Sequence, residues 1–118
     1  MFRGRVSYSL HAALELLTAT ALIAVPFTIG LSVDATITAA AVGIILFGLA
    51  VSATDSDGRG TLPISAHATY DAAVALVLVG AAIVFGFAGE LPALAFLLAA
   101  GIAQLILNAL TRYSPVRA

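Results

Sequence analysis

The run AHATYDAAVALVLVGAAIVFGFAG, residues 66–89, decides the fold of this chain. Its one histidine and one acid fall within the first six positions, and the rest is almost wholly apolar. A helix needs about 20 apolar residues to cross the roughly 30 Å hydrocarbon core of a bilayer. The run lacks the apolar and polar alternation of a membrane barrel strand. We therefore predict a membrane-spanning helix, which satisfies its own backbone in lipid.

Three further runs of similar length and composition occupy residues 12–31, 35–53 and 91–110. The connections after the first and third runs are very short, whereas the polar segment 54–64 joins the two halves. We predict an all-α fold, a polytopic transmembrane four-helix bundle made of two tandem helical hairpins. Residues 1–118 then form a single domain, with a first repeat at about 7–54, a central loop at about 54–64 and a second repeat at about 65–112.

The composition supports a membrane protein over its whole length. Of 118 residues 62% are hydrophobic and 9% are charged, whereas a soluble domain has about 25% charged residues. This deficit excludes a soluble globular or nucleic-acid-binding protein and makes the lipid bilayer the expected partner. The chain has no cysteine, which excludes disulfides and thiolate metal sites. Four short helices leave little room for a substrate cavity in one protomer, so we expect a homo-oligomer.

A short pattern, Ser-x-His-x-x-x-acid, occurs at residues 9–15 and again 56 positions later at residues 65–71. At the same offset Gly30 aligns with Gly86 and Asp34 with Glu90. Matches between scarce residues predict a diverged internal duplication. Because each copy crosses the membrane twice, both insert in the same orientation. We expect a pseudo-two-fold axis along the membrane normal, as in other parallel repeats.

The basic residues predict the orientation. All five are arginines, at positions 3, 5, 59, 112 and 117, whereas the two short connections carry acids. By the positive-inside rule both termini and the central loop are cytoplasmic, in a prokaryotic inner membrane. Tyr8, Tyr70 and Tyr113 are then expected near the cytoplasmic boundary, as members of an aromatic belt.

The two copies of the pattern supply candidate metal ligands. His11 and Glu15 are four residues apart and share one helix face, and His67 and Asp71 repeat this spacing. If the two-fold axis holds, the pairs face each other at the same depth in the bundle. Helical bundles build metal sites from histidines and carboxylates on facing helices. These nitrogen and oxygen ligands suit a divalent transition metal such as zinc, iron, manganese or copper(II).

The fourth run returns to this depth with further polar residues. Gln104 and Asn108 are four apart, and Arg112 lies a turn beyond. All three are candidates for a second shell around the ligands, where hydrogen bonds orient them.

Other interpretations of the polar groups remain open. The pairs can be internal links of a structural or assembly subunit, with each histidine bonding its own carboxylate. A second form of the metal-site interpretation is haem ligation by His11 and His67, which leaves the two acids without a role. Glu15 and Asp71 can instead exchange protons or cations in a small proton-coupled transporter. We expect no enzyme, because no nucleophile–base pairing and no phosphate or dinucleotide loop stands out.

Two family resemblances bear on these alternatives. The segment AVPFTIGL, residues 24–31, followed by an apolar run containing Val42-Gly43, resembles the bacterial SPW-repeat family. That family has a Ser-Pro-Trp signature near the outer end of the first helix. Residues 25–27 read Val-Pro-Phe here, and residues 81–83 of the second half lack the proline. The resemblance implies a membrane location without a defined activity.

The chain is also similar to the small multidrug-resistance transporters in its length, its four predicted helices and the presence of Glu15 in the first run. In that family a first-helix glutamate exchanges protons for cationic drugs across an antiparallel dimer. The arginine bias opposes such a dual topology. This resemblance supplies the transport alternative.

Overall fold

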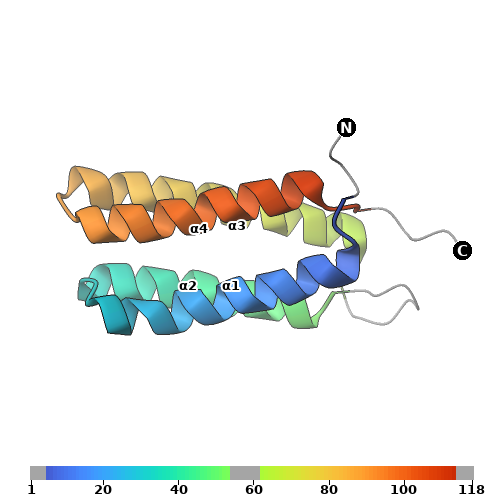
Figure 1. The fold of residues 1–118 in the computed structure, drawn as a ribbon, viewed down its shortest axis with the longest axis horizontal. Helices are drawn as coiled ribbons and strands as arrows, with labels where there is room; N and C mark the ends of the chain where they lie inside the picture. The colour runs from blue at the N-terminus through green and yellow to red at the C-terminus, as the bar shows by residue number, and fades with distance from the viewer. Residues whose placement is uncertain (1–4, 54–61, 114–118) are drawn as a thin grey trace, which may run out of the picture.

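Four helices account for most of the chain (Figure 1), and the computed structural model describes residues 5–53 and 62–113. The helices are α1 (Tyr8–Ile29), α2 (Val33–Val51), α3 (Ile64–Phe87) and α4 (Leu91–Leu110). Each is long and apolar enough to cross a membrane. The predicted all-α transmembrane four-helix bundle is confirmed. The predicted central loop falls largely on residues 54–61, which lie outside the described residues.

Serine caps extend the first two helices beyond their apolar runs. The Ser7 side chain accepts a hydrogen bond from the Leu10 N–H at 3.2 Å, and α1 begins at Tyr8, before the apolar run. Ser32 likewise accepts from the Ala35 N–H at 3.1 Å at the start of α2. Such caps satisfy N–H groups that have no partner within the helix. As a result His11 lies in the first turn of a formed helix.

Glycines close both hairpins at the end of the bundle opposite the chain termini (Figure 1). Gly30 follows α1 with φ of 67°, and its N–H donates to the Pro26 carbonyl. Gly89, which follows the end of α3, also has a positive φ, of 83°. This left-handed conformation is accessible to glycine because it has no Cβ. Each connection is short enough to make consecutive helices antiparallel neighbours.

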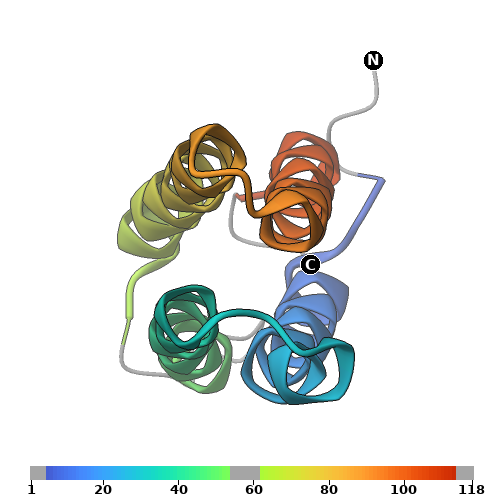
Figure 2. The ribbon, with the colours of Figure 1, turned by 90° about the vertical axis from the view of Figure 1, so that its left-hand side faces the viewer.

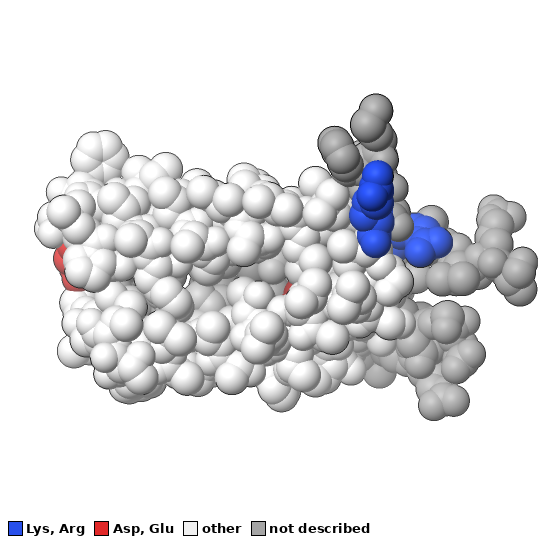
Figure 3. All heavy atoms as spheres, viewed as in Figure 1, with Lys and Arg blue, Asp and Glu red and all other residues white. Residues whose placement is uncertain are grey.

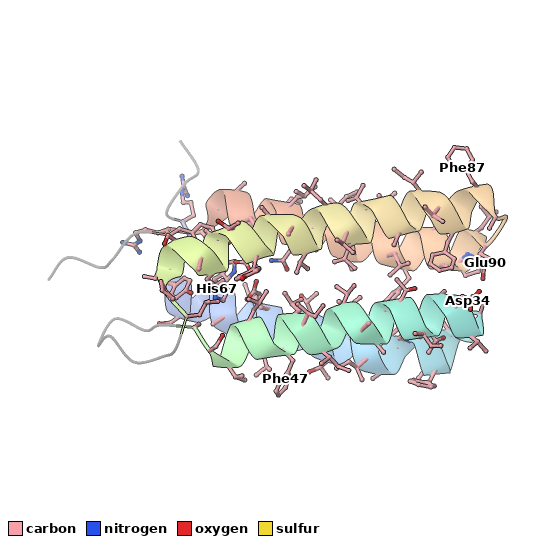
Figure 4. All side chains as sticks on the ribbon, turned by 180° about the vertical axis from the view of Figure 1, so that it is seen from behind. Asp34, Phe47, His67, Phe87 and Glu90 are labelled. Atoms are coloured by element: carbon pink, nitrogen blue, oxygen red, sulfur yellow. The ribbon has the colours of Figure 1, made fainter. Side chains whose placement is uncertain are left out.

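The helices occupy the corners of a square when viewed along the bundle, with α1 diagonal to α3 and α2 diagonal to α4 (Figure 2). One fully buried leucine from each helix fills the centre of the core: Leu22, Leu46, Leu78 and Leu97. Phe47 and Phe87 point away from the bundle (Figure 4), and Phe87 is 91% exposed. So extensive an apolar exterior is rare in soluble monomers and suits contact with lipid.

The buried positions of the two hairpins correspond. Those of α1 recur in α3 at an offset of 56, pairing His11, Glu15, Ala19, Leu22 and Pro26 with His67, Asp71, Ala75, Leu78 and Ala82. Those of α2 recur in α4 at an offset of 58, pairing Ala35, Ala39, Gly43 and Leu46 with Ala93, Leu97, Gly101 and Gln104. The offset grows because α3 has 24 residues and α1 has 22.

This change of offset corrects two of the sequence matches. Gly86 lies inside α3, whereas Gly30 lies beyond the end of α1. Asp34 lies in the first turn of α2, whereas Glu90 precedes α4. Neither pair occupies equivalent positions, because the two additional residues of α3 shift everything that follows.

Outside the buried core, opposite charges gather at opposite ends of the bundle. Arg5 precedes α1 and Arg112 follows α4, so both lie at the end that carries the chain termini, where Figure 3 shows basic side chains in blue. Asp34 and Glu90 lie at the hairpin end (Figure 4). The arginines at positions 3, 59 and 117 lie outside the described residues. The charge separation agrees with the arginine pattern, and the cytoplasmic location of the termini stays a prediction.

Candidate metal centre

Buried polar side chains gather at the arginine-bearing end of the bundle. Among the described residues, those that are buried and polar or charged are His11, Glu15, His67, Asp71, Gln104 and Thr111. The first four are fully buried. Burying ionisable groups in an apolar core is costly unless they are paired or bind an ion. The arrangement of these groups therefore carries information about function.

Two imidazoles and two carboxylates converge on one point, and we call these four residues the polar cluster. His11 Nε2 lies 2.8 Å from Asp71 Oδ2 and 3.0 Å from Glu15 Oε2. His67 Nε2 lies 2.9 Å from Glu15 Oε1 and 3.2 Å from Asp71 Oδ1. One ligand atom from each residue lies within 4.8 Å of all the others. The structure therefore brings together all four ligands predicted from the sequence.

The shortest contacts in the polar cluster run between helices. His11 of α1 is closest to Asp71 of α3, and His67 of α3 is closest to Glu15 of α1. The contacts within each helix, which the structural interpretation assumed, are the longer ones. The physical reason is the diagonal placement of α1 and α3, whose inward faces meet on the bundle axis. The polar cluster consequently connects the two hairpins.

Thr111 determines which ring nitrogen of His11 carries a proton. Thr111 Oγ1 lies 2.6 Å from His11 Nδ1, and its hydroxyl donates to the Leu107 carbonyl. A hydroxyl has one proton, so it accepts from the Nδ1–H of His11. The Nε2 of a neutral His11 then directs its lone pair at two carboxylates, a contact that is favourable only when a proton or a metal ion lies between them. Metal-bound histidines are oriented in the same way, by a hydrogen bond from the other ring nitrogen.

Gln104 contacts the polar cluster directly, and Asn108 contacts it through Gln104. The Gln104 amide donates one hydrogen bond to Glu15 Oε2 at 3.0 Å and another to Asn108 Oδ1 at 2.9 Å. Both predicted second-shell amides therefore lie beside the ligands. The third candidate, Arg112, has an exposed side chain, and its backbone N–H donates to the Val6 carbonyl. Its side chain lies outside the cluster because the chain is extended after α4, so that Arg112 points away while its neighbours Thr111 and Tyr113 contact the cluster.

Two tyrosines belong to the site, although the sequence indicated only interfacial anchors. The Tyr113 hydroxyl donates to Asp71 Oδ2 at 2.7 Å. The Tyr8 ring stacks on His11 with centroids 6.2 Å apart and meets His67 edge-on at 5.2 Å. The sequence could have indicated that Tyr8 belongs to the site, because it lies three residues before His11 and residues at this spacing are neighbours on a helix. For Tyr113 and Thr111, which follow α4, the sequence contained no comparable signal.

Tyr113 lies beyond the end of α4, where its hydroxyl faces the cluster. Burial and the hydrogen bond to Asp71 raise the pKa of Tyr113 well above its ordinary value. The phenol therefore stays protonated at physiological pH and remains a donor to the Asp71 carboxylate.

A backbone contact between the two ends of the chain holds Thr111 and Tyr113 in place. The Val6 N–H donates to the Leu110 carbonyl and the Arg112 N–H donates to the Val6 carbonyl, both at 3.0 Å. These two bonds form a short parallel bridge between Val6 and Thr111. Residues 111–113 are thereby fixed over the cluster.

A similar bridge without the hydroxyl joins the end of the first hairpin to the start of the second. Leu62 pairs with Ala53, which stands 58 positions before Thr111. Alanine offers no acceptor, and among the described residues His67 Nδ1 has no hydrogen-bond partner. The two histidines are therefore equivalent at Nε2 and different at Nδ1.

We expect Thr111→Val to lower the free energy of unfolding by about 1–3 kcal/mol, the usual cost of a buried donor left without its acceptor. Valine keeps the shape of threonine and removes only the hydroxyl that accepts from His11. Thermal unfolding in detergent measures the effect. The matched control is Thr69→Val, since the exposed Thr69 hydroxyl bonds only its own helix at Ser65. Equal effects of the two substitutions would contradict a structural role for the Thr111–His11 bond.

The distances between the ligand atoms fit a small metal ion. Bonds of about 2.0–2.2 Å in a tetrahedral site place neighbouring ligands roughly 3.3–3.5 Å apart. The four nitrogen–oxygen contacts measure 2.8–3.2 Å. An outward movement of a few tenths of an ångström thus admits an ion. Haem does not fit, because both carboxylates lie against the two imidazole Nε2 atoms and occupy the space that a porphyrin requires.

Comparison of the chain with protein-family models, with curated proteins and with solved structures gave no match. The function is therefore argued from the chemistry of the site. The resemblance to the SPW-repeat family stays a prediction.

Proposed function

We propose that this small integral membrane protein binds one divalent transition-metal ion in the polar cluster of His11, Glu15, His67 and Asp71. The observation that carries the proposal is the convergence of two imidazole Nε2 atoms and two carboxylates on one buried point. Imidazole and carboxylate ligands suit zinc, iron, manganese and copper(II). An ion held between α1 and α3 joins the two hairpins across the bundle.

The charge of the cluster supports a divalent ion. Two ionised carboxylates and two neutral imidazoles bring two negative charges into an apolar core, and one divalent cation neutralises both. The cluster also has spare acceptors, since Asp71 Oδ1 and Gln104 Oε1 are buried and receive no hydrogen bond. A cation between the ligands attracts such oxygens.

Two protons, one on each imidazole, would also neutralise the cluster, and this is the second candidate. It is favoured by the short contacts of His11 Nε2 and His67 Nε2 with both carboxylates. However, one N–H can point well at only one acceptor oxygen, because hydrogen bonds weaken steeply away from linearity. A metal ion can bond to all four side chains at once, so we prefer it.

The core beyond the cluster argues against a transport path through one chain. Towards the hairpin end, α1 and α3 contribute the fully buried Ala19, Leu22, Ala75 and Leu78. Within the described residues, the buried polar groups stop at the level of the cluster. An ion that enters from the arginine-bearing end thus meets an apolar barrier. A transporter that uses Glu15 and Asp71 needs a polar path from elsewhere, such as a second copy of the chain.

A duplicated hairpin explains why the ligands occur in matching pairs. Corresponding positions of α1 and α3 each supply one histidine and one acid, and the buried positions of α2 and α4 match as well. We infer that an ancestral hairpin formed a symmetric dimer with the ion on its two-fold axis. Fusion of two such hairpins then leaves the axis running through the polar cluster.

The test is the metal content of protein purified without a histidine tag. We expect close to one divalent ion per chain by elemental analysis. Chelation should lower the unfolding temperature and added Zn²⁺ should restore it, because a ligand at 100 times its Kd stabilises by about 2.7 kcal/mol. Metal-free protein whose unfolding temperature responds neither to a chelator nor to Zn²⁺ would refute the proposal. It would leave internal polar pairing as the role of the cluster.

A further inference from the structure

The carboxylate oxygens of the polar cluster are not equivalent. Glu15 Oε2 accepts a hydrogen bond from Gln104, and Asp71 Oδ2 accepts one from Tyr113. Each carboxylate therefore has one oxygen held by a neutral donor. The remaining oxygen of each, Glu15 Oε1 and Asp71 Oδ1, faces His67 Nε2, whereas the donor-held oxygens face His11 Nε2.

These donors restrict how each carboxylate can bind an ion. A hydrogen bond to an ionised carboxylate is among the stronger ones in proteins and fixes the plane of the group. The donor occupies a lone pair of the oxygen that it engages, which makes that oxygen the weaker ligand for an ion. The opposite oxygen, Asp71 Oδ1 in particular, is buried and receives no hydrogen bond. One oxygen from each acid is thereby left for the metal.

We propose that the polar cluster is a closed, four-coordinate site with two nitrogen and two single-oxygen ligands, which selects Zn²⁺-like ions over six-coordinate ions such as Mn²⁺. The ligands are His11 Nε2, His67 Nε2 and one carboxylate oxygen from each of Glu15 and Asp71. This inference rests on the proposed metal binding and names the class of ion. Tyr113 and Gln104 are its positioning residues, because they keep each acid from binding through both oxygens.

Burial supports a closed site. All four ligand residues have no exposed surface. Tetrahedral sites in which the protein supplies every ligand are of the structural kind, whereas catalytic sites keep a position open for water or substrate. The ion then serves to lock α1 to α3.

The positioning donors come from one hairpin, which distinguishes them from the ligands. Gln104 corresponds at the offset of 58 to Leu46, a fully buried apolar residue. Replacing Gln104 with leucine therefore gives α4 the residue that already packs at the matching position of α2. The variants Tyr113→Phe and Gln104→Leu each remove one donor while keeping most of the side-chain volume.

Co²⁺ is the probe, because its visible absorption is strong in four-coordinate sites and weak in six-coordinate ones. We expect strong absorption from the wild-type protein saturated with Co²⁺. Tyr113→Phe should weaken the absorption and lower the ratio of Zn²⁺ to Mn²⁺ affinity by about 10-fold or more, since residues that orient ligands typically change metal affinity 10–100-fold. Gln104→Leu should act in the same direction. Tyr70→Phe is the matched control, because Tyr70 is 53% exposed.

The outcomes separate this inference from the proposed function. If Co²⁺ binds to the wild-type protein with weak absorption, the four-coordinate assignment is wrong and metal binding stands. Unchanged spectra and affinity ratios in both variants would refute the positioning roles. If neither Co²⁺ nor Zn²⁺ binds, the proposed function itself fails. Circular dichroism of each variant checks that its helices are retained, so that a change in metal binding is not mistaken for loss of folding.

Discussion

The variant His11→Ala/His67→Ala is expected to bind divalent metal at least about 100-fold more weakly than the wild-type protein, beyond the upper range for residues that only orient ligands. The substitution removes both nitrogen ligands and leaves two carboxylates, which hold transition metals poorly in the absence of imidazole. Titration of the metal-free protein with Zn²⁺, followed by elemental analysis after gel filtration, measures the loss. Retained stoichiometric binding would place the metal elsewhere in the molecule.

A second variant keeps this test valid if the alanine variant does not fold. Removing both imidazoles leaves Glu15 and Asp71 buried with only the neutral donors Gln104 and Tyr113, and breaking a buried ion pair costs about 3–5 kcal/mol. Replacing all four residues of the polar cluster with leucine removes the charges as well, and such replacements are often neutral or stabilising. We expect this leucine variant to fold and its unfolding temperature to be insensitive to both Zn²⁺ and chelators. A response to either would contradict a site at the cluster.

Gly43→Leu is expected to destabilise the first hairpin by about 1–3 kcal/mol or more, the usual range for overpacking a core. A Cβ at Gly43 would lie 2.8 Å from Ile23 Cγ1 and 3.0 Å from both the Ala19 carbonyl oxygen and Leu22 Cβ. A backbone carbonyl inside a helix cannot move aside as a side chain can, so α1 and α2 must separate. Detergent-induced or thermal unfolding measures the effect.

The control lies on the same helix. A Cβ at Gly48 would meet nothing within 4 Å, so Gly48→Leu changes helix propensity in the same direction without crowding a neighbour. Gly101 in α4 matches Gly43, and a Cβ there would lie 2.8 Å from Val79 Cγ2 and 3.2 Å from Leu78 Cβ. Gly101→Leu should therefore behave like Gly43→Leu. Similar unfolding temperatures for the Gly43 and Gly48 variants would show that close packing of this hairpin matters little.

The sequence alone determined the fold class, the order of the helices and the location of the four candidate ligands. A membrane-spanning helix satisfies its own backbone, so length and apolarity are sufficient to predict it. Short connections then make neighbouring helices antiparallel. The spacing of four placed His11 with Glu15 and His67 with Asp71, and the two-fold relation predicted that the pairs face each other, as the structure shows.

Only the tertiary structure decided how these groups are connected. Each histidine is closest to the acid of the other hairpin, because α1 and α3 lie diagonally across the bundle and meet on its axis. Thr111 and Tyr113 reach the cluster from beyond α4, since the backbone pairing with Val6 fixes the residues that follow the helix. Periodicity describes which residues share a helix face. It carries no information on contacts between distant segments outside the helices, and these contacts complete the site.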